Sequence, residues 1–251
     1  MVRMAFFAAL LPLALLCAGP VGSSSVAGCP AASESVAPEA PPGALPRVAA
    51  ALKSGRLDVL AIGSATVLGA RGRAEGSFSD RMVQQLREAA PGAEIHLTVQ
   101  GERGMPATRM LALLRRQLAG KNFALVVWQT GTVEAARKLP AEEFARTLDA
   151  GAEAVHAAGA DLLLVDPQYS RMLQANTTLG PYRETMQQAA RRHAALLFSR
   201  FDLIRRWAEA GQLDLESAAK PEREKMAEQL NACLGQALAQ TVLRAAGLVR
   251  S

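Results

Sequence analysis

The chain has 251 residues and a formal net charge of +5, and half of its residues are apolar. This length is enough to bury one hydrophobic core, and the apolar fraction excludes a chain that is disordered throughout. Three Cys are too few for a scaffold held by several disulfides, and the three His are widely spaced, which argues against a metal site built on His.

Residues 1–27 have the pattern of an export signal. Arg3 precedes an apolar run over residues 5–18, which is short for a membrane span. Small residues follow and suit cleavage by signal peptidase after Ala27. We therefore predict a signal peptide over 1–27 and no transmembrane span in the mature chain. The protein is then exported to a bacterial periplasm or held at a membrane as a lipoprotein; an uncleaved amino-terminal anchor is the remaining alternative.

Cys29 has two competing uses. The run Val26-Ala27-Gly28-Cys29 resembles a bacterial lipobox, which would place a lipid anchor on Cys29. The apolar run ends about ten residues earlier, which is a loose fit to a lipobox and favours plain secretion. With Cys17 removed alongside the signal, Cys233 is the other remaining thiol, and nothing in the sequence decides whether it pairs with Cys29.

Residues 28–46 are rich in Ala, Pro, Ser and Glu and show no apolar periodicity, so we predict a flexible linker there. In residues 47–251, short apolar runs alternate with segments of helical spacing, which predicts one domain. Strands are expected at 57–62, 95–99, 123–128, 162–165 and 195–198. Helices are expected at 77–90, 105–118, 141–158, 181–193, 203–210 and 221–246.

The predicted strands are continuous apolar runs separated by helices. This pattern predicts an α/β three-layer sandwich, in which helices flank a parallel sheet on both faces. Functional residues of such sheets collect at the carboxyl ends of the strands. The segments to examine therefore begin at Gly63, Gly101, Gln129 and Asp166.

These four segments, in this order and spacing, resemble the SGNH (GDSL-type) hydrolase family over about residues 57–247. The most specific piece is Val-Val-Trp-Gln-Thr-Gly-Thr at 126–132, which resembles the family's third block. Ala-Ile-Gly-Ser at 61–64 resembles its first block. The resemblance implies a flavodoxin-like fold and hydrolysis of acyl esters on glycans or lipids, with no cofactor and no metal.

The resemblance also implies a Ser nucleophile, a His base oriented by an Asp three residues earlier, and an oxyanion site made by Gly and Asn. Matched position by position, this chain departs from the pattern. Ala65 stands at the nucleophile and Val133 at the Asn, while Gly104 is retained. The final Asp-x-x-His falls on Glu222 and Lys225. The resemblance thus implies a hydrolase fold with no intact set of catalytic residues.

We therefore expect an exported hydrolase-like protein that is catalytically inactive and binds an envelope glycan, an acyl-ester ligand or a partner protein. The alternative is an active esterase with Ser64 as a displaced nucleophile and Lys225 as its base, since a desolvated Lys can act as one. Lys225 has charged neighbours, however, which is typical of a solvated helical turn. A third hypothesis is an accessory subunit whose former pocket serves only as scaffold.

Nucleic acid is not an expected partner. The adjacent Arg pairs at 115–116, 191–192 and 205–206 lie on separate predicted helices, with no aromatic residues interleaved.

Overall fold

The computed structural model describes residues 28–30, 41, 43–69 and 74–248. The predicted signal peptide and its cleavage site lie outside these residues. Among the residues described, no helix combines the length and the apolar character needed to cross a membrane.

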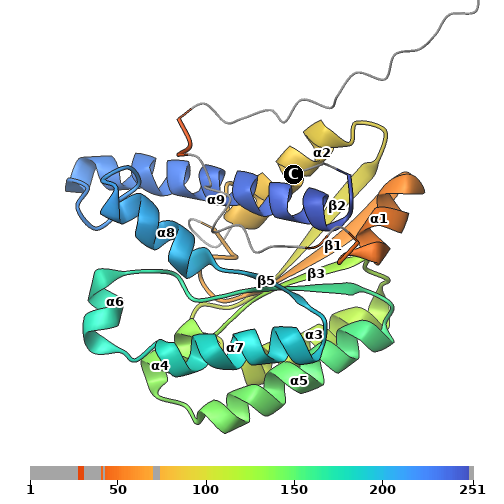
Figure 1. The fold of residues 1–251 in the computed structure, drawn as a ribbon, viewed down its shortest axis with the longest axis horizontal. Coiled ribbons are helices and arrows are strands. Elements are labelled where there is room, and N and C mark those ends of the chain that lie inside the picture. The colour runs from red at the N-terminus through yellow and green to blue at the C-terminus, as the bar shows by residue number, and fades with distance from the viewer. Residues whose placement is uncertain (1–27, 31–40, 42, 70–73, 249–251) are drawn as a thin grey trace, which may run out of the picture.

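A five-stranded parallel sheet forms the centre of the molecule (Figure 1). Its strand order is β2-β1-β3-β4-β5, and each neighbouring pair is parallel. The strands are β1 (Arg56–Gly63), β2 (Glu94–Gly101), β3 (Leu125–Gln129), β4 (Asp161–Val165) and β5 (Leu196–Phe198). The predicted α/β fold with a parallel sheet is confirmed.

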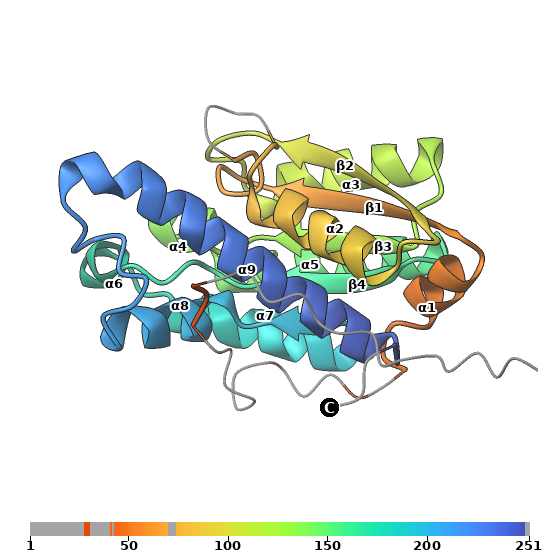
Figure 2. The same cartoon turned by 90° about the horizontal axis from the view of Figure 1, so that it is seen from above.

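Helices cover both faces of the sheet, as Figures 1 and 2 show. One face carries α2 (Phe78–Ala89), α8 (Arg200–Glu209) and α9 (Arg223–Ala245). The opposite face carries α3 (Ala107–Gly120), α5 (Ala141–Ala157) and α7 (Gly180–Arg192). The remaining helices are α1 (Pro46–Lys53), α4 (Thr132–Arg137) and α6 (Arg171–Asn176), with a 3-10 turn at Lys220–Glu222. Two hydrophobic clusters therefore form, one on each side of the sheet.

The central strands are buried on both faces, which explains their continuous apolar sequences. Every residue of β3 and β4 is buried. Along β1, Val59 and Ala61 enter the cluster under α2 and α9, whereas Leu60 and Ile62 enter the cluster under α3 and α5. Successive side chains of a strand point to opposite faces, so a strand covered on both sides needs apolar residues at every position.

A glycine allows α9 to lie directly against α2. A Cβ atom at Gly235 would lie 2.3 Å from the Cβ atom of Arg81 and 2.8 Å from the backbone nitrogen of Met82. Any side chain at this position would push the two helices apart. Close contact between α9 and α2 therefore depends on the missing side chain.

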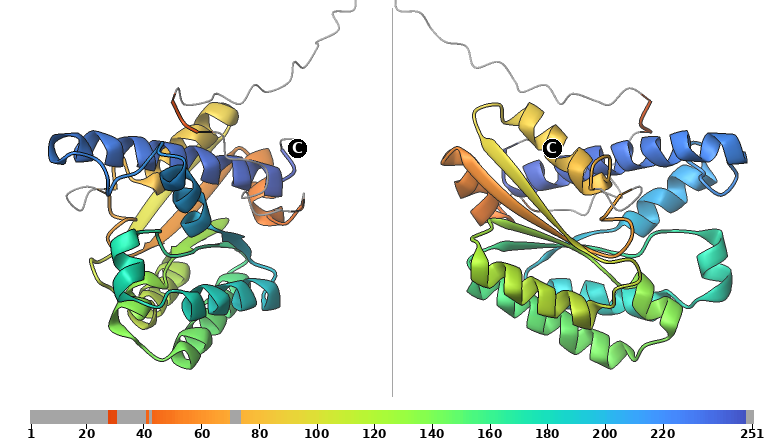
Figure 3. Two further views of the ribbon diagram at one scale, coloured as in Figure 1. Left: turned by 60° about the vertical axis from the view of Figure 1, so that its left-hand side comes forward. Right: turned by 180° about the vertical axis from the view of Figure 1, so that it is seen from behind.

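The described ends of the predicted linker are held against α9, which corrects part of the expectation for residues 28–46. Cys29 forms a disulfide with Cys233. The backbone nitrogens of Gly43 and Leu45 donate to the oxygen of Ala245 at 2.9 and 3.1 Å. The composition of this segment gave no sign of these contacts, because each is made with a residue about two hundred positions away in the chain. Figure 3 shows residues 28–30, drawn in red-orange, near α9 in two further views.

Candidate functional site at the carboxyl edge of the sheet

The carboxyl ends of β1 and β2 bring Ser64 and Gly104 together. Gly104 follows β2 in a turn with a φ of 72°, a conformation that favours glycine. Its backbone nitrogen donates to Ser64 Oγ at 2.9 Å. Ser64 is only 7 % exposed. The side chain of Ser64 therefore occupies the backbone N–H group of Gly104, the residue that the sequence resemblance matches to the oxyanion Gly.

Ala65, at the nucleophile position, lies half-buried in the turn that follows β1. The turn is closed by a hydrogen bond from the nitrogen of Val67 to the oxygen of Ser64, at 3.2 Å. Ala65 offers only a methyl group, so this position supplies no nucleophile.

Val133 and Glu134 lie in the short helix α4 after β3. Val133 is half-buried and has no hydrogen-bonding side chain. Glu134 is 2 % exposed and accepts from the nitrogens of Gly131 at 2.9 Å and Ala107 at 2.6 Å. Its carboxylate thus ties the turn after β3 to the start of α3, which is a structural task.

Glu222 and Lys225 lie on the surface. Glu222 ends the 3-10 turn, and Lys225 is in the first turn of α9; both are exposed. Within the described part of the chain, Ser64 Oγ has one hydrogen-bond partner, the nitrogen of Gly104. No hydrogen bond therefore connects Ser64 with Lys225, the base that a displaced Ser centre would need.

A polar network replaces the expected catalytic residues beneath the turn after β1. Gln129 Oε1, at the end of β3, accepts from the nitrogen of Ser64 at 3.3 Å and from Thr66 Oγ1 at 3.1 Å. Arg200 Nη1 donates to the same Thr66 hydroxyl at 3.0 Å. The turn that carries Ala65 is therefore held from two sides.

Arg200 and Asp166 form the buried centre of this network, and both are 1 % exposed. Arg200 Nε donates to the backbone oxygen of Asp166 at 3.2 Å. The Asp166 carboxylate accepts from the nitrogen of Phe201 and from Arg183 Nε, each at 2.9 Å. Arg183 extends the network to Asp202.

Burial is the main cause of the pKa shifts of Asp166 and Arg200. Burial raises the pKa of Asp166 to about 6, against the hydrogen bond from Phe201 and the charge of Arg183. Burial also lowers the pKa of Arg200 to about 10, against the charge of Asp166. Arg200 therefore stays protonated near neutral pH, because its pKa is still well above 7.

Comparison with known proteins identifies the family to which this chain belongs. A family model described as the Non-GDSL lipase-like family matches residues 28–248. The chain belongs to the Non-GDSL lipase-like family. No curated protein matches it.

Solved structures of esterases share the fold of this Non-GDSL lipase-like protein. A two-domain esterase active on acetylated mannans superposes with a TM-score of 0.67 at 15 % identity, over 84 % of this chain and 56 % of that one. A variant of an acetyl xylan esterase from Geobacillus stearothermophilus gives 0.60 at 15 % identity, over 78 % and 96 %. An α/β hydrolase from the Lake Arreo metagenome gives 0.56 at 17 %, over 78 % and 97 %. The fold is that of the SGNH-like hydrolases.

Sequence reasoning missed the role of Arg200 in this Non-GDSL lipase-like site. The sequence prediction covers the segments after the first four strands and leaves out the segment after β5. Arg200 lies two residues after Phe198, the last residue of β5. The rule that placed Ser64 and Asp166 at the site therefore also points to Arg200. Arg183 gave no such signal, because it lies inside an ordinary helical pattern.

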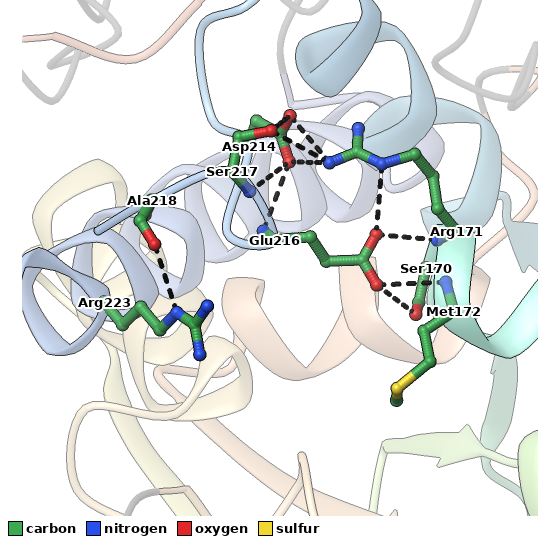
Figure 4. Close-up of polar contacts among 8 residues, drawn as sticks. All are labelled: Ser170, Arg171, Met172, Asp214, Glu216, Ser217, Ala218 and Arg223. Atoms are coloured by element: carbon green, nitrogen blue, oxygen red, sulfur yellow. Dashed lines mark hydrogen bonds and ion pairs between the residues drawn. The ribbon is translucent and has the colours of Figure 1, made fainter. Parts of the chain in front are cut away.

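The segment between α8 and the 3-10 turn, which contains Asp214 and Glu216, is fastened to α6 (Figure 4). The Glu216 carboxylate accepts from Ser170 Oγ at 2.7 Å and from the nitrogens of Arg171 at 2.7 Å and Met172 at 3.2 Å. Arg171 Nη2 donates to both oxygens of Asp214, at 2.9 and 3.0 Å. We call this group, Ser170 to Met172 with Asp214 and Glu216, the α6 clasp.

The charges of the α6 clasp favour ionised carboxyl groups. Burial opposes ionisation of Asp214, but hydrogen bonds from Ser217 and Arg171 outweigh it and lower its pKa. Burial likewise opposes ionisation of Glu216, and the bonds from Ser170 and Arg171 lower its pKa. The acidic residues of this segment therefore serve to hold α6.

The three His lie away from Ser64. His96 is in β2, where its Nε2 is 3.0 Å from a carboxylate oxygen of Glu94. His156 ends α5 and His193 follows α7, and both line a groove of about 750 Å³ beside the amino ends of β4 and β5. His193 Nε2 is 2.9 Å from Asp149 Oδ1. In the described structure, none of the three is hydrogen-bonded to Ser64.

Proposed function

We propose that this protein is exported, does not hydrolyse esters, and acts by binding a cell-envelope ligand. One observation carries the proposal. Ala65 supplies no hydroxyl, and the hydroxyl of the preceding residue, Ser64, accepts a hydrogen bond from the nitrogen of Gly104. The N–H group that should hold an oxyanion is thus satisfied by the protein's own side chain.

Ester hydrolysis by a Ser enzyme needs three things at once. A nucleophile must be activated by a base within hydrogen-bond reach, and donors must stabilise the oxyanion. Losing one oxyanion donor alone typically costs about 10²–10³ in rate. Here the nucleophile is replaced by Ala65, the Asn donor by Val133, and the base by the exposed Lys225.

The remaining polar groups at the carboxyl edge of the sheet make hydrogen bonds that stabilise the fold. Arg200, Asp166 and Gln129 use their hydrogen bonds to hold the turn after β1 and the start of α8. Glu134 joins two turns. These contacts maintain the family's fold at the place where the family's reaction has been lost.

An acylated glycan is the ligand class to test first. The structures with this fold include enzymes named for acetyl xylan and for acetylated mannans. A protein that kept recognition and lost hydrolysis would bind such a molecule without removing its acyl groups. An acyl-ester lipid and a protein partner are the other outcomes of the binding experiment.

The first experiment measures turnover. The exported full chain is assayed with p-nitrophenyl acetate beside its Ser64→Ala variant, with Ser54→Ala as a control at an exposed Ser. We expect the same background rate for all three and no labelling by a fluorophosphonate probe. If the wild type and Ser54→Ala hydrolyse the ester, Ser64→Ala does not, and the probe labels Ser64, then the alternative hypothesis of Ser64 as a displaced nucleophile is correct.

The second experiment measures binding. Acetylated and chemically deacetylated xylooligosaccharides are titrated into the protein by calorimetry. We expect binding of the acetylated form with no release of acetate. If neither form gives a measurable heat of binding, acetylated xylan fragments are excluded as the ligand.

A further inference from the structure

The structure favours one of the two uses of Cys29 that the sequence leaves open. Cys29 is bonded to Cys233, and the two Cα atoms are 5.3 Å apart, within the usual range for disulfides. A sulfur atom in a disulfide cannot also carry a thioether-linked lipid. The lipobox-like run that ends at Cys29 therefore competes directly with this bond.

We propose that Cys29 is the fixed disulfide partner of Cys233 and is not lipid-modified, so that the mature protein is released from the membrane. This inference does not rest on the proposed binding function. It concerns the chemistry of one residue and the processing of the chain.

Gly28, which precedes Cys29, also contacts α9. The backbone oxygen of Gly28 accepts a hydrogen bond from Gln229 Nε2, on α9, at 3.1 Å. Lipoprotein processing cuts between Gly28 and Cys29 and makes the cysteine the first residue. Such a cut would remove the residue that contacts Gln229. Cleavage after Ala27 would keep Gly28 and would therefore allow this contact.

The surroundings of the two sulfurs also fit a disulfide. Cys233 is 2 % exposed and belongs to the hydrophobic cluster under α9, together with Leu230 and Leu234. Cys29 is half-buried against the same cluster. A lipid attached to Cys29 would have to extend from this apolar cluster into a bilayer. Without the disulfide, Cys233 would remain a buried free thiol.

The far end of the same segment is fastened to α9 as well. Gly43 and Leu45 both donate to the oxygen of Ala245. Cys233 and Ala245 are roughly 18 Å apart along a straight helix. The chain between Cys29 and Gly43 is long enough to connect these points, since an extended chain covers about 3.3 Å per residue. Both attachments can therefore exist together.

Formation of the disulfide between Cys29 and Cys233 is a two-electron oxidation. Two thiols lose two protons and two electrons and form one S–S bond. The electrons pass by thiol–disulfide exchange to the disulfide of a thiol oxidase in the export compartment, where such bonds persist. A reducing compartment would leave both thiols free.

Intact-mass measurement of the exported full chain tests the proposal. The protein is produced with its own signal in a Gram-negative host, and it is denatured and alkylated with iodoacetamide before and after reduction. We expect a chain that contains Gly28, carries no lipid mass, takes up no label before reduction and takes up two after it. A chain that starts at a lipid-bearing Cys29 and takes one label on Cys233 without reduction would overturn the proposal.

Two variants keep the experiment decisive. Cys233→Ser frees the sulfur of Cys29, and we expect one label on it without reduction and no lipid. Cys29→Ser is the matched control, with one label on Cys233 under the same denaturing conditions. Lipid on Cys29 in Cys233→Ser would contradict the proposal, because it would show that the lipobox is read. Neither outcome depends on esterase activity or on glycan binding.

Discussion

Arg200 donates from Nη1 to the hydroxyl of Thr66 over 3.0 Å and so joins the start of α8 to the turn that carries Ala65. The guanidinium is almost fully buried. Its Nε also holds the backbone oxygen of Asp166. One cationic side chain therefore fixes the geometry at the carboxyl ends of three strands, β1, β4 and β5.

Replacing Arg200 with Leu should destabilise the fold strongly. The change leaves the backbone oxygen of Asp166 and the Thr66 hydroxyl without the donor that Arg200 supplies, and each buried polar group left unsatisfied costs about 1–3 kcal/mol. Urea unfolding followed by circular dichroism measures the loss. Arg205→Leu on the same helix is the control, because Arg205 is 45 % exposed and pairs only at the surface. Equal losses for both variants would contradict a special role for Arg200.

Asp166 should make stability depend on pH. Its folded pKa, about 6, lies above its ordinary value of 3.8. The folded state then holds the proton more tightly than the unfolded state, so this contribution is fully present below about pH 4 and is lost as the pH rises through 6. We expect the stability difference between the wild type and Asp166→Asn to fall across pH 4–7 in urea titrations. A difference that rises or stays constant would show that Asp166 ionises normally.

Restoring a hydroxyl at the nucleophile position should not restore activity. Ala65→Ser supplies an alcohol, but no base is bonded to it, and Val133 cannot donate to an oxyanion. We expect p-nitrophenyl acetate hydrolysis by Ala65→Ser to equal that of the wild type. A large gain in rate from this single change would mean that a base and an oxyanion site are still present.

The α6 clasp should control local opening more than global stability. Glu216→Gln removes the charge that accepts from Ser170 Oγ and from the nitrogens of Arg171 and Met172. Hydrogen exchange at Arg171 and Met172 should speed up, while the unfolding midpoint changes little because the clasp is exposed. Glu222→Gln, at a surface position outside the clasp, should leave both amides unchanged. Unchanged exchange in Glu216→Gln would show that the clasp does not hold α6.

Adding one methyl group at Gly235 should separate α9 from α2. The new Cβ would meet Arg81 at 2.3 Å, so we expect a destabilisation of about 1–3 kcal/mol for Gly235→Ala. Gly120→Ala, at the end of α3, is the matched control, since nothing lies within 4 Å of its Cβ position. Chemical unfolding distinguishes the two variants, and equal stability would contradict the close approach of the helices.

Most of the fold could be predicted because it follows from hydrophobic pattern. The run at 123–128 is apolar at nearly every position, and the strand observed there, Leu125–Gln129, is buried throughout. The helices α4 and α6 were missed because each has only six residues, fewer than two turns. Helix α1 was missed because its first residue, Pro46, was assigned to a Pro-rich linker; proline suits the first position of a helix.

The candidate site was only partly predictable, for a different reason. The sequence placed Ser64, Ala65 and Gly104 at strand ends, and the structure confirms these positions. Sequence spacing cannot show that the Ser64 hydroxyl would take the Gly104 N–H. Nor can it show that Arg200 would reach Thr66, since that contact depends on how strands far apart in the chain lie side by side in the sheet.

The bond between Cys29 and Cys233 also constrains the order of steps in the biosynthesis of the protein. A chain that crosses a membrane from its amino terminus exposes Cys29 long before Cys233 arrives. If this protein is exported as proposed, the thiol of Cys29 stays without its partner until nearly the whole domain has been translocated. No other cysteine follows residue 29 before Cys233, so removal of the predicted signal together with Cys17 leaves Cys233 as the one partner for Cys29 within the chain. Oxidation can then join the two cysteines only after Cys233, which lies on α9, has followed Cys29 across the membrane.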